Sequence, residues 1–514
     1  MGEKQDDVES PNSSSIIQDV DLEATLVHTT EKKLMAKIDF HILPVLCVLY
    51  LLAFLDRVNI SNAAIFGLRK DLGIEDGTKY NTALTIFFVP YILFEVPISQ
   101  QSPILQSGNR TNYVSFQIPS NILLKKLKPH VWLSGCMFFF GLVTMLQGLT
   151  QNYAGILTTR FFLGLFETGM FPGCFYLMGM WYKRSEAQKR FSFFFSSTTL
   201  AGAFGGLLAS GIGKMDGMNG YLGWRWVFIL EGVLTCVVSF AWFFLIPDFP
   251  EDVKWLNDEE RAFIRAKLAK DSGTSGHEIS MSWRDVLDVL KDYKIIVGGF
   301  MYFGLIVPAY GYAYFAPTII KTFGYGPIET QLYSIPPWAA AFAFAMTIAF
   351  LSDRLKHRFL FCLAPICVAI AGFAILLNVQ GPGNRSVRYG ALFLITMGAY
   401  SAMPVIVCWF AMNLGGHKRR SIGTAWQIAF GNIGGIIATY AFLEKDSPSF
   451  KPGYSISIAF ICLSAASCVV YFSLLQYRNK SRDKNASIDA VANPDQAAAD
   501  SRLGDLSPSY RYQM

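Results

Sequence analysis

The chain has 514 residues, of which 52% are hydrophobic and only 16% are charged. Soluble globular chains carry about 25% charged residues, so this composition excludes a soluble enzyme and a disordered protein. The 44 basic and 38 acidic residues give a net charge of +6, and the basic residues lie in short loops rather than in one patch, which argues against nucleic-acid binding. The composition predicts a polytopic membrane protein.

Apolar segments recur twelve times along the chain, which also excludes a single-pass receptor. Their length and their content of Phe, Leu, Ile, Ala and Gly are typical of membrane-spanning helices. The predicted fold class is therefore an all-α membrane protein with 12 transmembrane helices in two six-helix halves. The segments lie at about 41–61, 81–97, 131–150, 153–181, 190–213, 226–247, 295–317, 331–352, 359–379, 388–412, 421–442 and 454–476.

The nine cysteines all fall inside these apolar segments. That placement is typical of small buried hydrophobic residues and predicts neither a disulfide framework nor a metal site. We therefore expect no metal and no cofactor.

Lys and Arg in short loops predict the orientation, because such loops are enriched on the cytoplasmic side. The basic loops at Lys125, Lys183, Arg354 and Lys418 fall on one side, so both termini are expected to be cytoplasmic. Six spans on each side of a charged linker are typical of a transporter built from two halves. The predicted order is a tail (1–37), a first half (38–247), a linker with amphipathic helices at 249–270 and 282–292 (248–294), a second half (295–477) and a disordered tail (478–514).

Residues 96–119 do not fit this layout, because a polar stretch interrupts the second span. Removing 22 residues, for example Val96–Gln117, restores an apolar run that leads directly into the basic loop at Lys125. We hypothesise that this segment is a translated intron or a gene-model error. If the segment is present in the translated protein, we expect a misfolded, inactive product. The alternative is a genuine polar loop.

Four of the charged residues inside predicted spans are the most informative, because each charge in lipid costs about 2.5–3.5 kcal/mol on insertion scales. Asp56 and Arg57 come late in span one, and Arg160 and Glu167 lie seven residues apart in span four. Seven residues are nearly two helical turns, so Arg160 and Glu167 share a face. A rise of about 1.5 Å per residue brings Arg57 and Arg160 to comparable depth.

These residues have a functional and a structural interpretation. In the first, the two guanidinium groups bind a substrate carboxylate, and Asp56 or Glu167 takes up protons. In the second, Asp56 and Arg57 cap a helix end and Arg160 and Glu167 form a stabilising network. The functional interpretation is favoured for both pairs, whereas Glu231 in span six is interpreted as structural.

A short loop after span eight carries Asp353 beside three basic residues, Arg354, Lys356 and Arg358. A loop on the cytoplasmic side explains the bases but not the Asp. We interpret Asp353, Arg354 and Arg358 as a gating motif, a latch between moving halves.

With these motifs the chain resembles transporters of the major facilitator superfamily, and within it the fungal anion:cation symporters of the allantoate and nicotinate permease type. The loop at 352–358 is similar to the loop motif of the superfamily, although its counterpart at 123–128 is degenerate. The resemblance covers residues 32–480 and is carried by 37–44, 54–63, 160–172 and 223–232.

The resemblance implies roles for individual residues. Asp56, Arg57, Arg160 and Glu167 match positions that serve proton coupling and anion binding in organic-anion transporters. A tyrosine of span two and an asparagine of span eleven contact substrate in such relatives, which implies substrate-binding roles for Tyr91 and Asn432.

The predicted function is proton-coupled import of a small organic anion, such as nicotinate, allantoate or a vitamin-like carboxylate, by a monomer in a fungal plasma membrane. The proton gradient supplies the driving force, and an outward-open cavity admits the anion to Arg57 and Arg160. A uniporter or exporter of the same fold and a transporter-derived nutrient sensor remain alternatives. A membrane enzyme is not expected, because the spans carry no cluster of a nucleophile, metal ligands or a His–carboxylate pair.

Overall fold

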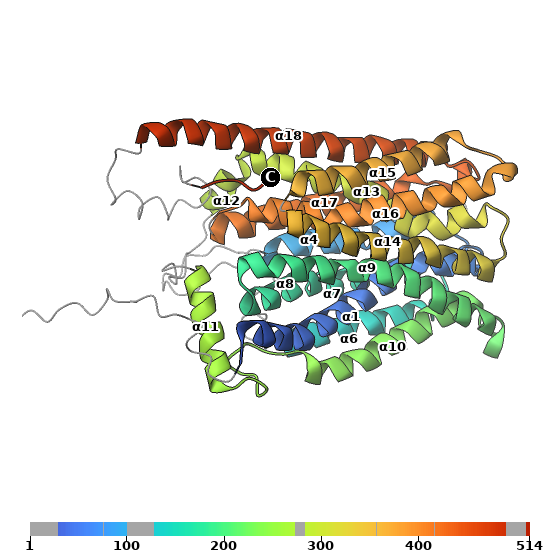
Figure 1. Ribbon diagram of the computed structural model, residues 1–514. Coiled ribbons are helices and arrows are strands. Elements are labelled where there is room, and N and C mark those ends of the chain that lie inside the picture. The colour runs from blue at the N-terminus through green and yellow to red at the C-terminus, as the bar shows by residue number, and fades with distance from the viewer. Residues whose placement is uncertain are drawn as a thin grey trace, which may run out of the picture.

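The computed structural model describes residues 29–75, 77–99, 128–272, 283–355, 357–415, 417–489 and 510–514. Long helices run side by side along one axis, and the short helix α11 lies across one end of the bundle (Figure 1). We call this end, where α1 begins and α11 lies, the linker end. The hypothesis about residues 96–119 concerns a segment that lies almost entirely outside the described residues.

The all-helical fold class is confirmed in the described part of the chain, where ten helices are long and apolar enough to cross a membrane. Two further predicted spans correspond to the pair α3 and α4 and to α17, which together complete the expected arrangement of twelve. The helices of the first half are α1 (Glu31–Ile65), α2 (Leu68–Asp71), α3 (Lys79–Thr85), α4 (Phe88–Ser99), α6 (Pro129–Gln147), α7 (Tyr153–Glu167), α8 (Met170–Trp181), α9 (Arg184–Ile212) and α10 (Gly223–Leu245).

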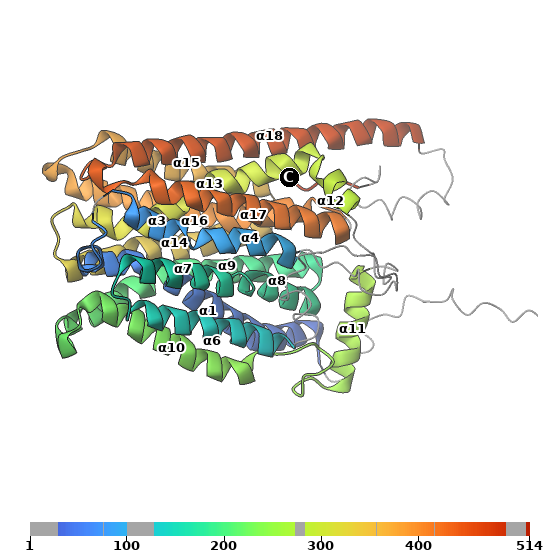
Figure 2. The same cartoon turned by 180° about the vertical axis from the view of Figure 1, so that it is seen from behind.

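The second half begins after two linker helices. The linker helices are α11 (Asp258–Ser272) and α12 (Trp283–Leu290), and the helices that follow are α13 (Tyr293–Lys321), α14 (Pro327–Leu355), α15 (Arg358–Asn378), α16 (Arg385–Met412), α17 (His417–Ala441) and α18 (Lys451–Asp489). The two halves meet where α9 packs against α14 and α16, α1 against α13, and α3 and α4 against α17. Figure 2 shows the last of these contacts, with α3 and α4 beside α17.

Predicted span four is divided into two helices. It breaks at Thr168 and Gly169, between α7 and α8. The indole Nε1 of Trp132 donates to the carbonyl of Gly169 over 3.2 Å, so a carbonyl at the break keeps a donor inside the bundle. A Cβ on Gly169 would lie 2.7 Å from the Trp132 ring, so a larger residue would separate α6 from this break.

Ion pairs fasten α11 to the linker end of the first half. Glu260 accepts from Lys37 of α1 at 2.8 Å, and Lys267 donates to Glu186 of α9 at 2.6 Å. Lys267 also pairs with Glu31 at 2.8 Å. Because these pairs join α1, α9 and α11, the first linker helix is part of the packed structure of this end.

The prediction of a disordered tail after residue 477 is wrong for two stretches. Helix α18 continues to Asp489, and residues 510–514 pack against the linker ends of α13, α16 and α18. Tyr512 is 4% exposed, and its hydroxyl accepts from Lys294 at 2.7 Å. The backbone of Gln513 exchanges two hydrogen bonds with the Asn413 side chain, at 2.8 and 3.0 Å. The polar composition of the tail conceals these two short packing signals.

Candidate functional site

Helix α1 places two adjacent charged residues, Asp56 and Arg57, inside the bundle. Both are buried, with exposures of 0% and 3%. Neighbouring residues on a helix point about 100° apart, so the two side chains meet different partners. Arg57 contacts α7 and α13, whereas Asp56 lies beside Thr144 of α6 and Thr235 of α10.

Arg57 is the centre of an ionic and aromatic cluster. Its Nε and Nη2 both donate to Oε1 of Glu167 on α7, the first over 3.0 Å. Its Nη1 donates to the hydroxyl of Tyr310 on α13. The guanidinium also lies 5.0 to 6.0 Å from four ring centroids, those of Phe54, Phe87, Tyr91 and Tyr310, within the range of cation–π attraction. One side chain therefore joins helices of both halves.

Arg160 has fewer partners than Arg57. Its Nη1 donates to the backbone carbonyl of Arg57 over 2.8 Å, but Nε and Nη2 have no hydrogen-bond partner, although the side chain is only 1% exposed. Its electrostatic neighbours include Tyr80, Tyr314 and Glu167, and the Tyr314 hydroxyl also lacks a partner. A buried guanidinium with two unused donors is costly, and a carboxylate is the group best suited to satisfy them.

Glycine explains how α7 brings its charges to this place. Gly164 lies between Arg160 and Glu167, and a Cβ there would be only 2.1 Å from the carbonyl oxygen of Phe87. No side chain fits, so the backbones of α7 and of the α3–α4 junction touch. This contact brings Arg160 and Glu167 to the level of Phe87 and Tyr91.

The sequence-predicted substrate and proton residues are mostly brought together. Arg57, Arg160 and Glu167 form one cluster, and Tyr91 of α4 adds its ring to it. Asn432 is buried on α17, which packs against α4 and α13. Asp56 faces the other side of α1.

Two tyrosines of this site were not identified from the sequence. Tyr310 and Tyr314 lie four residues apart on one face of α13, and their rings stack with centroids 5.9 Å apart. In the sequence they belong to an apolar run with several other aromatic residues, and so resemble ordinary core or interface residues. The four-residue spacing was the signal that could have found them.

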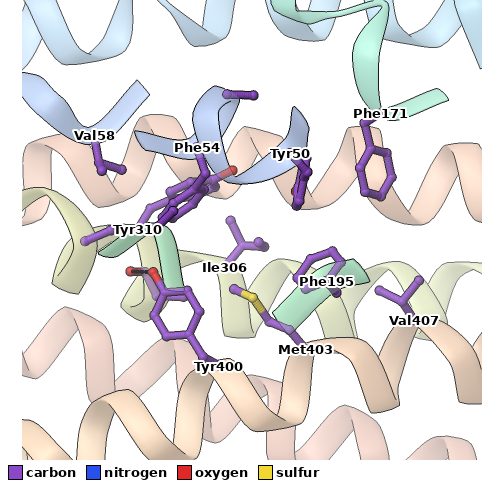
Figure 3. Close-up of a cluster of buried hydrophobic side chains, with 14 of the residues drawn as sticks. Tyr50, Phe54, Val58, Phe171, Phe195, Ile306, Tyr310, Tyr400, Met403 and Val407 are labelled. Atoms are coloured by element: carbon purple, nitrogen blue, oxygen red, sulfur yellow. Dashed lines mark hydrogen bonds between the residues drawn. The ribbon is translucent and has the colours of Figure 1, made fainter. Parts of the chain in front are cut away.

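Toward the linker end, buried apolar and aromatic side chains fill the space between the two halves. Tyr50 and Phe54 of α1, Ile306 of α13, and Tyr400 and Met403 of α16 lie together in this region (Figure 3). They separate the ionic cluster from the linker end. The expected open cavity at Arg57 and Arg160 is not present among the described residues, since tight packing leaves these side chains at most 3% exposed.

Two cavities in the described part of the chain lie away from the cluster. One, of about 460 Å³, is lined by Asp71, Tyr221 and Arg225. The other, of about 420 Å³, lies between α9 and α14 and is lined by Phe193, Asp353 and Arg354, among others.

The predicted gating residues lie at the junction of α14 and α15. Arg358 donates from Nη2 to Asp353 over 2.5 Å and from Nη1 to the Ser352 hydroxyl over 2.7 Å. Arg354 is exposed and lines the second cavity with Phe193 of α9. The ion pair therefore joins two helices of one half, and the exposed Arg354 faces the boundary with the other half.

Comparison with known sequences gives a consistent result. The profile of the Major Facilitator Superfamily matches residues 104–439. The "MFS-type transporter cnsO" of Penicillium expansum is 31% identical over 504 residues, which cover 96% of this chain and 92% of the relative. The "High-affinity nicotinic acid transporter" of Saccharomyces cerevisiae is 31% identical over 487 residues, which cover 94% of this chain and 85% of the relative.

Solved structures share the fold at low sequence identity. A bacterial homologue of the human lysosomal transporter Spinster, inward-facing and unoccupied, superposes with a TM-score of 0.61 at 13% identity, covering 84% of this chain and 95% of that one. A D-xylose–proton symporter gives a TM-score of 0.59 at 16% identity, covering 84% of this chain and 97% of the other.

Proposed function

The chain belongs to the major facilitator superfamily, and on that premise we propose that it imports a small organic anion together with protons. It is a multi-pass membrane transporter and not an enzyme. The finer proposal concerns the substrate class, the coupling ion and the residues that carry each. We place the transporter in the plasma membrane of a fungal cell as a monomer, with both termini cytoplasmic.

The observation that carries the proposal is the pair of unused donors on Arg160. Nε and Nη2 of this buried guanidinium have no hydrogen-bond partner, and the Tyr314 hydroxyl beside it is in the same state. A carboxylate accepts two parallel hydrogen bonds from a guanidinium. Binding of an anion there would offset the buried positive charge, which favours a carboxylate over a neutral or cationic substrate.

Coupling to protons follows from competition for the second guanidinium. Glu167 accepts two hydrogen bonds from Arg57, so an ionised Glu167 holds this arginine away from any substrate. Protonation of Glu167 removes the charge that holds Arg57 and makes its donors available. Asp56 is proposed as a second proton acceptor, and the gradient of protons then drives accumulation without a further cofactor.

The rings around the cluster bear on the shape of the substrate. Phe87, Tyr91 and Tyr310 surround the Arg57 guanidinium, and flat rings accommodate a planar carboxylate well. A nicotinic acid transporter is among the relatives, so nicotinate is the first compound to test, followed by allantoate and vitamin-like carboxylates. Tyr91 and Asn432 are proposed to contact the part of the substrate away from its carboxylate.

Release to the other side requires that the two halves, 38–247 and 295–477, move relative to each other. The aromatic side chains between the cluster and the linker end would have to separate. Asp353, Arg354 and Arg358 are proposed to steady that movement, because Asp353 and Arg354 line the cavity between α14 and α9 and Arg358 is bound to Asp353.

Uptake of a panel of labelled carboxylates at pH 5 and pH 7 tests the proposal. Expression of the chain should raise uptake of at least one carboxylate, more strongly at the acidic pH. Arg160→Ala should abolish uptake, and Arg160→Lys, which keeps the charge but not the two parallel donors, should restore only part of it. Uptake that does not change with external pH would favour a uniporter. Accumulation of the labelled carboxylate by the Arg160→Ala variant would contradict the assignment of the anion site.

A further inference from the structure

A second polar cluster lies beside a different face of α1 from the one that carries Arg57. Asp56 of α1 and Glu231 of α10 are 0% and 1% exposed, and the charge of Asp56 acts on Glu231. Neither oxygen of Asp56 has a hydrogen-bond partner, and Oε1 of Glu231 has none either. Oε2 of Glu231 accepts from the side-chain amide of Asn59, one turn after Asp56.

Close helix packing forms the walls of this cluster. A Cβ on Gly141 of α6 would lie 2.9 Å from Cγ2 of Thr235, and a Cβ on Gly232 of α10 would lie 2.3 Å from the backbone nitrogen of Met145. The two helices α6 and α10 are therefore in close contact at both glycines. This crossing places hydroxyl groups beside Asp56, those of Thr144 and Thr235.

The hydroxyl groups beside Asp56 carry no positive charge that could compensate a buried carboxylate. Thr144 donates its proton to the carbonyl of Phe140 over 3.0 Å, and the Thr235 hydroxyl has no hydrogen-bond partner. Gln147, three residues after Thr144 on the same face of α6, is fully buried with both amide atoms unpartnered. The walls are polar, yet they carry no charge.

The charged groups that face the pair are few. From α7, Arg160 and Glu167 act on Asp56 at a distance, and Arg57 of α1 is bound to Glu167. On α10, Cys236 is also an electrostatic neighbour of Asp56. In the described residues no Lys or Arg donates a hydrogen bond to either carboxyl group of the pair. Two ionised carboxylates in such a place would cost several kcal/mol each, so a buried group of this kind becomes neutral instead.

We propose that Asp56 and Glu231 together bind one proton at neutral pH and form a proton site that does not touch the substrate. A proton held between two carboxyl groups leaves a single negative charge, which the nearby Arg160 partly offsets. Glu231, interpreted from the sequence as structural, thus becomes a residue of the coupling machinery. The inference rests on and extends the proton coupling proposed above, and it assigns a proton to the face of α1 that meets α6 and α10.

Infrared spectroscopy of the purified full chain in lipid nanodiscs tests this site without any substrate. The carbonyl band of a protonated carboxylic acid should be present at neutral pH and disappear as the pH is raised. The double variant Asp56→Asn/Glu231→Gln should lose this band component. Glu231→Gln alone should keep it but move its disappearance to lower pH, because Asp56 then lacks a like charge beside it.

Glu260→Gln is the matched control, since it removes a buried carboxylate of α11 that is ion-paired with Lys37, away from Asp56, and it should leave the band and its titration unchanged. A band unchanged in the double variant would overturn the proposal, as would displacement of the band by Na⁺ but not by K⁺. If the double variant does not fold, the shift in Glu231→Gln decides, and an unchanged titration there contradicts the shared proton. The infrared measurement needs no transport. A negative result in the carboxylate uptake panel would therefore contradict the proposed function without deciding whether Asp56 and Glu231 share a proton.

Discussion

The two halves of the molecule treat buried charge differently. The first half holds its buried charges well beyond the first turns of α1, α7 and α10, where each is at most 3% exposed. In the described part of α13–α18, by contrast, the buried charged residues lie within the first four positions of their helices. The first set is Asp56, Arg57, Arg160, Glu167 and Glu231, and the second is Lys294, Arg358 and Arg388.

This difference indicates a division of labour. The first half supplies the groups that exchange charge, and the second half supplies an aromatic wall of Tyr310, Tyr314 and Tyr400, with one hydroxyl that reaches Arg57. Buried charge is costly in a membrane, so its concentration in one half favours a role in transport. Matched substitutions between the halves and within each half can test the division.

The largest contrast is expected between two buried arginines, each with unpartnered Nε and Nη2. Arg160→Ala should lower substrate affinity about a hundredfold or more, because loss of one partner of a buried charged hydrogen bond costs about 2–5 kcal/mol. Arg388 of α16 lies 4.7 Å from the Phe323 ring and serves as the matched control from the second half. Arg388→Ala should change affinity less than threefold in a binding assay, and equal losses in both variants would contradict the division of labour.

The next contrast concerns helix packing in the first half. Gly164→Ala places a methyl group against the Phe87 carbonyl, at a site where a Cβ would be 2.1 Å away, and overpacking of this kind costs about 1–3 kcal/mol. We expect a lower melting temperature and less transport, because Arg160 and Glu167 move with α7. Gly179→Ala on α8 is the control, since nothing lies within 4 Å of its Cβ position. A melting temperature for Gly164→Ala equal to that of Gly179→Ala would argue against the close contact.

A smaller effect is expected from the hydroxyl that joins the halves. Tyr310→Phe removes the acceptor for Nη1 of Arg57, and hydrogen bonds to charged groups contribute about 1.5–3 kcal/mol, so substrate affinity should fall about tenfold. Tyr400→Phe removes a hydroxyl that donates to the carbonyl of Ala309 over 3.0 Å, away from Arg57. If both variants bind substrate equally well, the Tyr310 hydroxyl has no special role in the site.

The smallest effect is expected at the junction of α14 and α15. Asp353→Asn removes the charge that faces Arg358 but keeps an oxygen that can accept its hydrogen bond, and the pair lies outside the ionic cluster around Arg57. The transport rate should fall only a few-fold, with substrate affinity unchanged. A loss of affinity comparable with that of Arg160→Ala would place this motif in the binding site instead.

The fold could be predicted from the sequence because lipid imposes strong rules on it. Hydropathy predicts the spans, and these must be helices because a helix satisfies its own backbone hydrogen bonds in lipid. The family resemblance predicts how the helices are arranged. Helical geometry also brought Arg57 and Arg160 to comparable depth and put Glu167 on the same face as Arg160. The hypothesis that residues 96–119 are a translated intron stays a prediction, and sequencing of transcripts from the source organism decides it.

The remaining features depend on contacts that no local pattern records. Arg57 is expected from the sequence to face an open cavity, but its side chain is bound to Glu167. This pairing depends on how α1 packs against α7. Tyr310 contributes its hydroxyl and its ring to the surroundings of Arg57, but in the sequence it stands in a run of aromatic residues typical of an ordinary core. Tyr512 was missed because an average over the polar tail conceals one aromatic side chain that packs against Lys294. Asp56 was placed with Arg57 in the sequence, yet the two face different helices.

The central claim is that a carboxylate of the first half couples protons to movement of an anion, and Glu167→Gln in proteoliposomes tests it most directly. Two rates are measured with the carboxylate found in the uptake panel: accumulation driven by an inward proton gradient, and exchange of labelled for unlabelled substrate without a gradient. We predict that Glu167→Gln loses accumulation and retains exchange, since a neutral side chain mimics the protonated state permanently. Accumulation equal to that of the unmodified protein would contradict the claim.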